Sequence, residues 1–230
     1  TGIKFEDVND SFILNNRISN NVYRGIWLSY NTYNNVIQDN TVNPNYDYGI
    51  LLYSSSSNNT IINNVVNFNI AALTEVYGIY LSGSDYNKII DNLANNNSNG
   101  IVLHSGASYN EIVKNTANDN SVNGIIIEIN SKMNIVEGNT ANNNHIRGIL
   151  IAAASQNTVI DNDFSNNYDQ GIMVSLGSGN DFNDNLVCDN TNNDFYCIDS
   201  ETNLASGNTF DTRNGCAWAD AGRKSCPQTP

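Results

Sequence analysis

Two residues that can exchange protons occupy the same position of consecutive sequence repeats. His104 and Glu128 each lie four residues after the glycine of a Gly-Ile pair, at Gly100 and Gly124. If the repeats stack as strands, these side chains lie side by side, with backbones ~5 Å apart. A histidine beside a carboxylate can act as general acid and base, and Arg147, two repeats beyond His104, could neutralise an anionic group. A surface ion pair is the structural alternative.

Aromatic residues form a second group of candidates. The position two residues after each repeat glycine is mostly apolar and holds Trp27, Leu51, Tyr80, Val102, Ile126, Leu150 and Met173. In an alternating strand this position faces outward, so the sequence predicts an apolar stripe on the surface. Trp27, Tyr53 and Tyr80 could form a platform for an amphipathic sugar. Coverage by a loop of the same chain, or by a partner subunit, is the alternative.

A repeat of about 23 residues positions both groups and runs through nearly the whole chain. Its Gly-Ile pair recurs at Gly2, Gly25, Gly49, Gly78, Gly100, Gly124, Gly148 and Gly171. One asparagine column is Asn35, Asn59, Asn87, Asn110, Asn134, Asn157, Asn180 and Asn203. A second is Asn16, Asn40, Asn64, Asn92, Asn115, Asn139, Asn162, Asn185 and Asn208. A fixed period of this kind predicts a solenoid.

Each repeat divides into three short strands whose apolar residues point to a shared interior. The second strand contributes Ile37, Ile61, Ile89, Ile112, Val136, Val159, Phe182 and Ala205, and the third Val42, Val66, Ala94, Ala117, Ala141, Phe164, Val187 and Phe210. We therefore expect an all-β, right-handed parallel β-helix, a single-stranded solenoid of about eight to nine coils of 23–24 residues. The asparagines stand at turns and can bond to one another along the stack, so we interpret them as structural.

The repeat is interrupted at two places. About four extra residues fall within residues 68–77, in a loop that is as compatible with function as with neutral insertion. The last repeat is degenerate, so we expect β-helix coils over residues 1–185 and a C-terminal cap over residues 186–230. The chain opens inside a repeat, as a piece excised from a longer protein would. Four cysteines allow three disulfide pairings, of which we prefer the local pairs Cys188–Cys197 and Cys216–Cys226.

Composition limits the partners. The net charge of −13, with only 10 Lys and Arg, argues against nucleic acid, and no apolar run is long enough to insert into a membrane. An even set of cysteines favours an extracellular or cell-surface location. The histidines lie far from the cysteines in sequence, so we predict no metal site and no cofactor. Asp39, Asp91, Asp161 and Asp184 form a broken acidic column that could hold Ca²⁺ loosely, although a solvated face is the simpler reading.

The repeat motifs resemble a known family. The Gly-Ile strand of residues 25–30, Asn59-Thr60-Ile61 and the asparagine-rich residues 139–143 resemble NosD-like parallel β-helix repeat proteins. The asparagine-rich style with a cysteine-containing end is similar to surface proteins of methanogenic archaea. The resemblance implies the fold but not an activity, because the superfamily includes carbohydrate binders, surface-layer proteins, polysaccharide lyases, hydrolases and uronan epimerases. No catalytic motif is carried over from it.

The sequence favours a cell-surface module with a structural or carbohydrate-binding role, whose partner is a polysaccharide or cell-surface glycan. A polysaccharide lyase or epimerase that uses His104, Glu128 and Arg147 is the first alternative. A hydrolase fits less well, because Glu128 has no carboxylate neighbour in its column. Self-association into a surface layer or filament is the second alternative.

Overall fold

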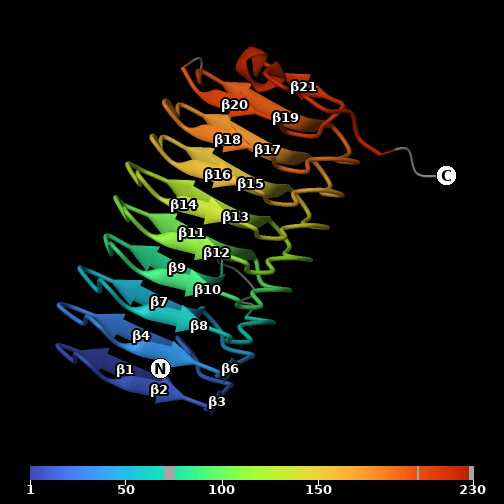
Figure 1. The fold of residues 1–230 in the computed structure, drawn as a ribbon. Coiled ribbons are helices and arrows are strands. Elements are labelled where there is room, and N and C mark those ends of the chain that lie inside the picture. Colours follow the sequence, from blue (N-terminus) through green and yellow to red (C-terminus); the bar gives the residue numbers. More distant parts are fainter. Residues whose placement is uncertain (70–75, 201, 228–230) are drawn as a thin grey trace.

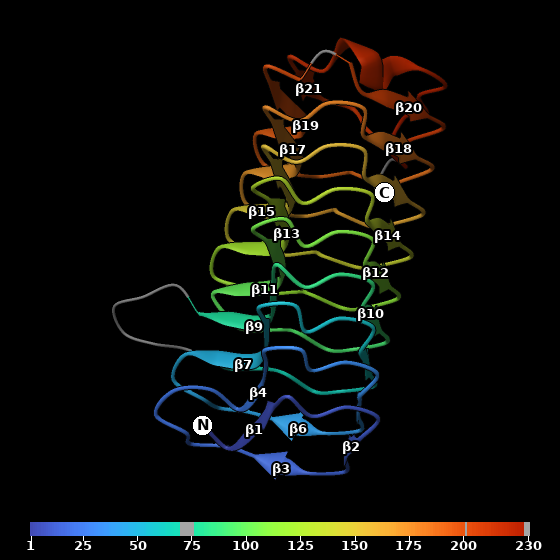
Figure 2. The same ribbon diagram turned by 90° about the vertical axis from the view of Figure 1, so that its left-hand side faces the viewer.

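The computed structural model describes residues 1–69, 76–200 and 202–227, and these form a stack of parallel coils (Figure 1). The first coils lie at one end of the stack and the last strands at the other, with successive coils directly above one another (Figure 2). Strands of consecutive coils pair in parallel and in register, for example Ile101 with Ile79 and with Ile125. The predicted parallel β-helix is therefore confirmed.

Two long sheets and a short one make the sides of the stack. The first sheet comprises, in spatial order, β1 (Ile3–Glu6), β4 (Ile26–Ser29), β7 (Tyr48–Tyr53), β9 (Tyr77–Ser82), β11 (Asn99–His104), β13 (Asn123–Glu128), β15 (Arg147–Ala152), β17 (Gln170–Ser175), β19 (Asn193–Ile198) and β21 (Arg213–Asn214). The second comprises β2 (Phe12–Leu14), β5 (Val36–Gln38), β8 (Thr60–Ile62), β10 (Lys88–Ile90), β12 (Glu111–Val113), β14 (Ile135–Glu137), β16 (Thr158–Ile160), β18 (Asp181–Asn183) and β20 (Leu204–Ser206). The third side holds β3 (Arg17–Ile18) and β6 (Thr41–Val42), continued by single bridges up to Thr209 and Lys224.

The core lies inside the stack and follows the predicted columns. Ile37, Ile61 and Ile89 of the second sheet are completely buried, as are Val66, Ala94 and Phe164 of the third side. The first sheet contributes the residues one and three positions after each glycine, such as Ile101 and Leu103. Burial of these ladders removes their apolar surface from water, which is the main favourable contribution to stability.

The two predicted asparagine columns are buried hydrogen-bonded ladders. In each, a side-chain Nδ2 and a backbone N–H of one coil donate to the Oδ1 of the next, as from Asn92 to Asn115 at 3.0 and 2.9 Å. Nδ2 also donates to a backbone carbonyl one coil below, as from Asn92 to Ile61 at 2.9 Å. The ladders satisfy turn backbone that would otherwise be buried without partners. The structural interpretation of the asparagines agrees with this arrangement.

A third asparagine ladder, which the sequence analysis did not identify, runs along the remaining turn. Its members are Asn21, Asn45, Asn69, Asn97, Asn120, Asn144, Asn167 and Asn190. Each lies five residues after a member of the second column, so the signal was present in the spacing. The ladder ends at the buried Asp194, whose Oδ1 accepts from Asn190 Nδ2 at 3.0 Å.

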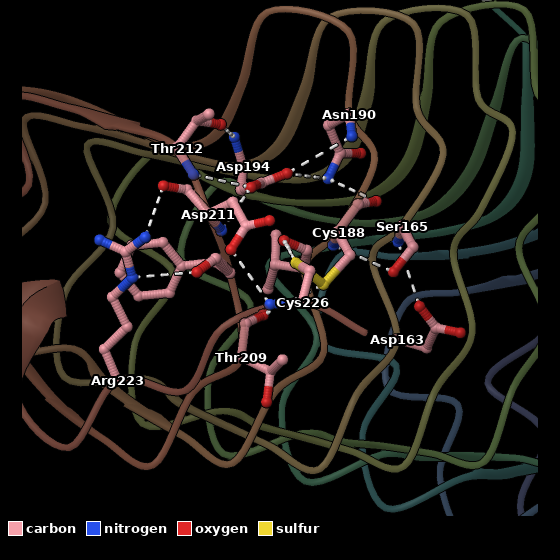
Figure 3. Close-up of a disulfide and its surroundings, with 12 residues drawn as sticks. Asp163, Ser165, Cys188, Asn190, Asp194, Thr209, Asp211, Thr212, Arg223 and Cys226 are labelled. Atoms are coloured by element: carbon pink, nitrogen blue, oxygen red, sulfur yellow. Dashed lines mark hydrogen bonds between the residues drawn. A yellow bond between two sulfur atoms is a disulfide. The ribbon is translucent and has the colours of Figure 1, made fainter. Parts of the chain in front are cut away.

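The C-terminal end of the stack carries the 3-10 helix η1 (Ala217–Asp220) and two disulfides, and the predicted local cysteine pairs are wrong. The bonds are Cys188–Cys226, drawn in Figure 3, and Cys197–Cys216. Each joins cysteines of different layers. Cys197 belongs to β19 and Cys216 follows β21, the strand paired with β19. Register between stacked layers, rather than proximity in sequence, decides the pairing.

Two other expectations concern the loops and the membrane. The insertion expected within residues 68–77 falls mainly on residues 70–75, which lie outside the described residues. Of the helices in the described part of the chain, none is both long and apolar enough to cross a membrane.

Candidate functional site

The outer face of the first sheet carries three neighbouring columns of side chains. They stand one residue before, two residues after and four residues after each repeat glycine, because strand alternation is interrupted at that glycine. A Cβ on Gly49 would lie 2.3 Å from the core atom Val66 Cγ1, so the glycine faces inward, as the buried Ile50 after it does. The residue before each glycine therefore turns outward, beside the residue two positions after it. Tyr77 and Tyr80 show this, with ring centroids 4.8 Å apart.

The three aromatic residues predicted for carbohydrate binding meet around one cavity on this face. The cavity has a volume of about 320 Å³ and is lined by Arg24, Trp27, Tyr48, Leu51, Tyr53 and Tyr80. Trp27 and Tyr80 are half-buried, whereas Tyr53 is exposed. Strands β4, β7 and β9 position these residues in consecutive coils. The predicted apolar stripe is present but partly covered, since Leu51, Val102 and Ile126 are buried.

A tyrosine cluster forms one wall of the cavity. The ring of Tyr48 stacks on that of Tyr77 at 5.3 Å and meets Tyr80 edge-on at 5.2 Å. Burial raises the pKa of Tyr80, and the charges of Tyr48 and Glu128 add to the shift, so its hydroxyl is protonated at neutral pH. A protonated hydroxyl can both donate and accept hydrogen bonds, as recognition of sugar hydroxyls requires. Of the other lining residues, Leu51 belongs to the predicted outward stripe, whereas the sequence analysis assigned no binding role to Tyr48 or Arg24.

Arg24 lies in the same cavity and is held by aromatic rings alone. Its Cζ lies 4.4 Å from the centroid of Trp27 and 5.7 Å from that of Tyr48. With the described residues its guanidinium forms neither a hydrogen bond nor an ion pair, and its Nε is buried without a partner. The nearby Asp47 is half-buried; burial raises the pKa of its carboxyl, and the positive charge of Arg24 opposes that shift.

Polar atoms without partners concentrate on this face. Among the described residues, seven buried side-chain N or O atoms lack a hydrogen bond, and five of them belong to its columns: Arg24 Nε, Trp27 Nε1, Ser29 Oγ, Asn99 Nδ2 and Asn123 Oδ1. Buried polar groups are normally satisfied, so such a cluster calls for an explanation. Two of the five atoms, Arg24 Nε and Trp27 Nε1, belong to residues that line the cavity.

His104 and Glu128 lie together, as predicted, directly beside the tyrosine cluster. His104 Nε2 is 3.8 Å from Glu128 Oε1, and the two side chains are 26% and 29% exposed. The imidazole also contacts the Tyr80 ring, at 5.7 Å between centroids, and its Nδ1 is hydrogen-bonded to Ser105. Neither His104 nor Glu128 is among the residues that line the cavity, and His104 adjoins it through its contact with the Tyr80 ring.

Arg147 does not join this pair. It begins β15, whereas Glu128 ends β13, so the two positions are separated by about five residues along the strand, or ~16 Å. Its Nε donates to Gln170 Oε1 at 2.8 Å. Burial lowers the pKa of Arg147, and the charge of Asp169 opposes this shift. The arginine nearest to the aromatic residues is Arg24.

The described residues contain no group of three His, Cys, Asp or Glu side chains able to hold a metal ion. The aspartates suggested for Ca²⁺, namely Asp39, Asp91, Asp161 and Asp184, are all exposed. All four cysteines are disulfide-bonded. His145 lies on a different turn from His104 and stacks on Tyr168.

Comparisons with known proteins agree with the architecture. The family model "Periplasmic copper-binding protein (NosD)" matches residues 104–223, and the model "Right handed beta helix region" matches residues 1–92. The latter supports the predicted right-handed coil. Among curated protein sequences, none matches this chain.

Solved structures with the same fold include three of particular interest. The periplasmic alginate epimerase AlgG has a TM-score of 0.80 at 19% identity, over 87% of this chain and 50% of that chain. The Dettilon tailspike protein gp208 has a TM-score of 0.69 at 17% identity, over 94% of this chain and 50% of that chain. The A-module of the Azotobacter vinelandii mannuronan C-5 epimerase AlgE6 has a TM-score of 0.64 at 13% identity, over 96% of this chain and 92% of that chain. This chain thus spans about half the length of AlgG, and at these identities the likeness shows the fold alone.

Proposed function

Since the chain belongs to the NosD family of parallel β-helix proteins, we propose that it is an extracytoplasmic β-helix module that binds carbohydrate on the outer face of its first sheet. The NosD family is named for copper binding, but the residues that the structure describes do not fit a copper site. The cysteines are oxidised, and His104 and His145 stand on separate parts of the coil. The proposed role therefore assigns no metal to the described residues.

The observation that carries the proposal is the cavity in which aromatic rings and unpartnered polar atoms meet. Trp27, Tyr53 and Tyr80 offer apolar ring surface, and Arg24 Nε and Trp27 Nε1 are donors without acceptors. Sugar-binding sites combine such surface with a few directional polar groups, because a sugar has both apolar and hydroxyl faces. Two of the similar structures are an alginate epimerase and a mannuronan C-5 epimerase, which agrees with a glycan partner.

The disulfides support the proposed location. Two disulfides near the C-terminus are typical of an oxidising compartment outside the cytoplasm, such as the periplasm or the cell surface. Of these, the cell surface is the location we propose, because an elongated module with a lateral binding face is suited to a glycan layer.

Binding and turnover should be measured together on a panel of neutral and acidic polysaccharides. We expect retention of the protein on at least one polymer without formation of unsaturated or reducing ends. Trp27→Ala and Tyr80→Ala should each weaken retention by at least about tenfold, because buried aromatic anchors dominate binding. Tyr168→Ala, which removes an exposed aromatic residue on another turn, is the matched control and should bind normally.

An enzyme is the second candidate, and the contact of His104 with Glu128 and Tyr80 favours it. In that case products, or a change of sugar stereochemistry seen by proton NMR, should appear and should vanish in His104→Gln and Glu128→Gln. Such a result would replace the binding module with a polysaccharide lyase or epimerase. If the protein neither binds nor converts any polymer, both proposals fail and self-association becomes the remaining hypothesis, to be checked by sedimentation.

A further inference from the structure

The aromatic cavity contains an arginine whose hydrogen-bonding capacity is unused. A guanidinium has five N–H donors and no acceptor, and in proteins these donors are usually paired with carboxylates or carbonyls. Arg213 and Arg223 follow this rule in the cap, where they bond to Asp220 and to the carbonyl of Phe210. Arg24 instead rests on the rings of Trp27 and Tyr48. Nothing in the described part of the chain accepts a hydrogen bond from it.

The other charges near the cavity do not replace a partner for Arg24. Lys4 Nζ also lies over Trp27, at 4.5 Å from the ring centroid, but Lys4 forms an ion pair with Glu6. The positive charge of Arg24 acts to lower the pKa of the Asp47 carboxyl, but Asp47 forms no ion pair with Arg24 and does not line the cavity. The one positive charge at the cavity without an ion-pair partner among the described residues is therefore Arg24.

The second unpartnered atom at the cavity, Trp27 Nε1, is a hydrogen-bond donor like Arg24 Nε. Trp27 Nε1 is a donor only, so both unsatisfied atoms among the lining residues require an acceptor. Rotation about the flexible Arg24 side chain would present its planar fork to an oxygen pair, the geometry in which arginine binds carboxylates most strongly. The flat rings of Trp27 and Tyr80 would contact the sugar body next to that group.

We infer that the glycan bound in this cavity is anionic, and that Arg24 selects it by binding the carboxylate or sulfate of one sugar unit. This inference rests on the proposed function and gives its ligand class. The long-range field of the protein works against such a ligand, because the net charge of −13 repels polyanions. A preference for acidic polymers must then come from a local contact, and Arg24 is the group placed to make it.

The test compares polymers that differ in charge alone. Polygalacturonate and its fully methyl-esterified form are one pair, and dextran sulfate and dextran are the other. At ~0.15 M salt, where the Debye length is about 8 Å, we expect the wild-type protein to bind one acidic polymer at least about tenfold more tightly than its neutral counterpart. The pair that shows the preference identifies the group as carboxylate or sulfate.

Variants of Arg24 test whether this residue causes the preference for acidic polymers. Arg24→Gln should lose the acidic preference and bind both members of the pair equally, whereas Arg24→Lys should keep part of it, since a point charge remains without the fork. Arg17→Gln removes an exposed arginine on β3 and should retain the full preference. Circular dichroism on each variant confirms that the fold is intact.

Two results would overturn the inference while leaving carbohydrate binding in place. One is equal binding of acidic and neutral polymers by the wild-type protein, and the other is an acidic preference that survives in Arg24→Gln. Failure to bind any polymer of either pair, or of the neutral panel, would instead reject the proposed function together with the inference.

Discussion

A single buried asparagine makes several hydrogen bonds at once. Asn115 Nδ2 donates to the carbonyls of Ile89 and Val113 at 2.8 and 3.1 Å and to Asn139 Oδ1 at 3.0 Å. Its Oδ1 accepts from the backbone and side chain of Asn92. Shorter or apolar side chains cannot reproduce this set, because they lack the paired donor and acceptor of a primary amide.

At this scale we predict that Asn115→Ala lowers the free energy of unfolding by on the order of 3–5 kcal/mol, since several buried partners are left unsatisfied. Urea denaturation followed by circular dichroism measures the change. Asn192→Ala is the matched control, because Asn192 is exposed and makes one surface hydrogen bond to Asp169. A loss below about 1 kcal/mol for Asn115→Ala would contradict the structural role of the ladders.

Individual residues also show which positions the repeat period could predict and which it could not. Periodicity placed His104 beside Glu128 and Ile112 in the core, because stacked coils convert equal repeat positions into spatial neighbours. It selected Arg147 from the column of residues before each glycine and not Arg24, because the repeat alone does not show which member of that column lies beside the aromatic residues. Only the backbone turn at the glycine, a three-dimensional feature, brings Arg24 out beside Trp27.

At the scale of elements, η1 packs against the last coils of the core. Trp218 of η1 stacks on Phe182 at 5.1 Å and meets Phe195 edge-on at 6.1 Å. The disulfide Cys188–Cys226 closes a loop with a sequence separation of 38 and holds the chain after η1 against the third side. The repeat pattern predicted a stapled cap, but it contains no information on which layers the cysteines join.

Removal of this disulfide by Cys188→Ser with Cys226→Ser should destabilise the protein by about 4 kcal/mol, from the restriction that the closed loop imposes on the unfolded chain. Cys197→Ser with Cys216→Ser, whose sequence separation is 19, should cost about 3 kcal/mol by the same reasoning. Denaturant unfolding of the two double variants provides the comparison. Unchanged stability in both variants would show that the cap does not depend on its covalent links.

At the scale of the whole molecule, charge is the dominant global property. A net charge of −13 destabilises a folded chain through self-repulsion, and salt screens that repulsion. We therefore predict that the melting temperature rises between ~10 mM and ~150 mM NaCl, where the Debye length falls from about 30 to 8 Å. Weakening of exposed pairs such as Lys88–Glu111, at 3.4 Å, is a smaller opposing effect.

The salt prediction has a simple control. An uncharged osmolyte at equal osmolality should not reproduce the dependence on low salt concentrations, because it does not screen charge. A melting temperature that falls as salt is added would mean that ion pairs, rather than self-repulsion, control the stability of this acidic molecule.

The asparagine ladders also give the molecule an electrical direction. In all three, each hydrogen bond between the side chains of two ladder asparagines runs from Nδ2 of one coil to Oδ1 of the next, as in Asn139 to Asn162 and Asn162 to Asn185. The amide dipoles then align along the axis, with their positive ends toward the C-terminal coils, in the way that peptide dipoles align in a helix. Asp194, at the end of the third ladder, places a carboxylate at that positive end. A stack built of neutral amides is thus a polarised rod whose last position favours a negative charge.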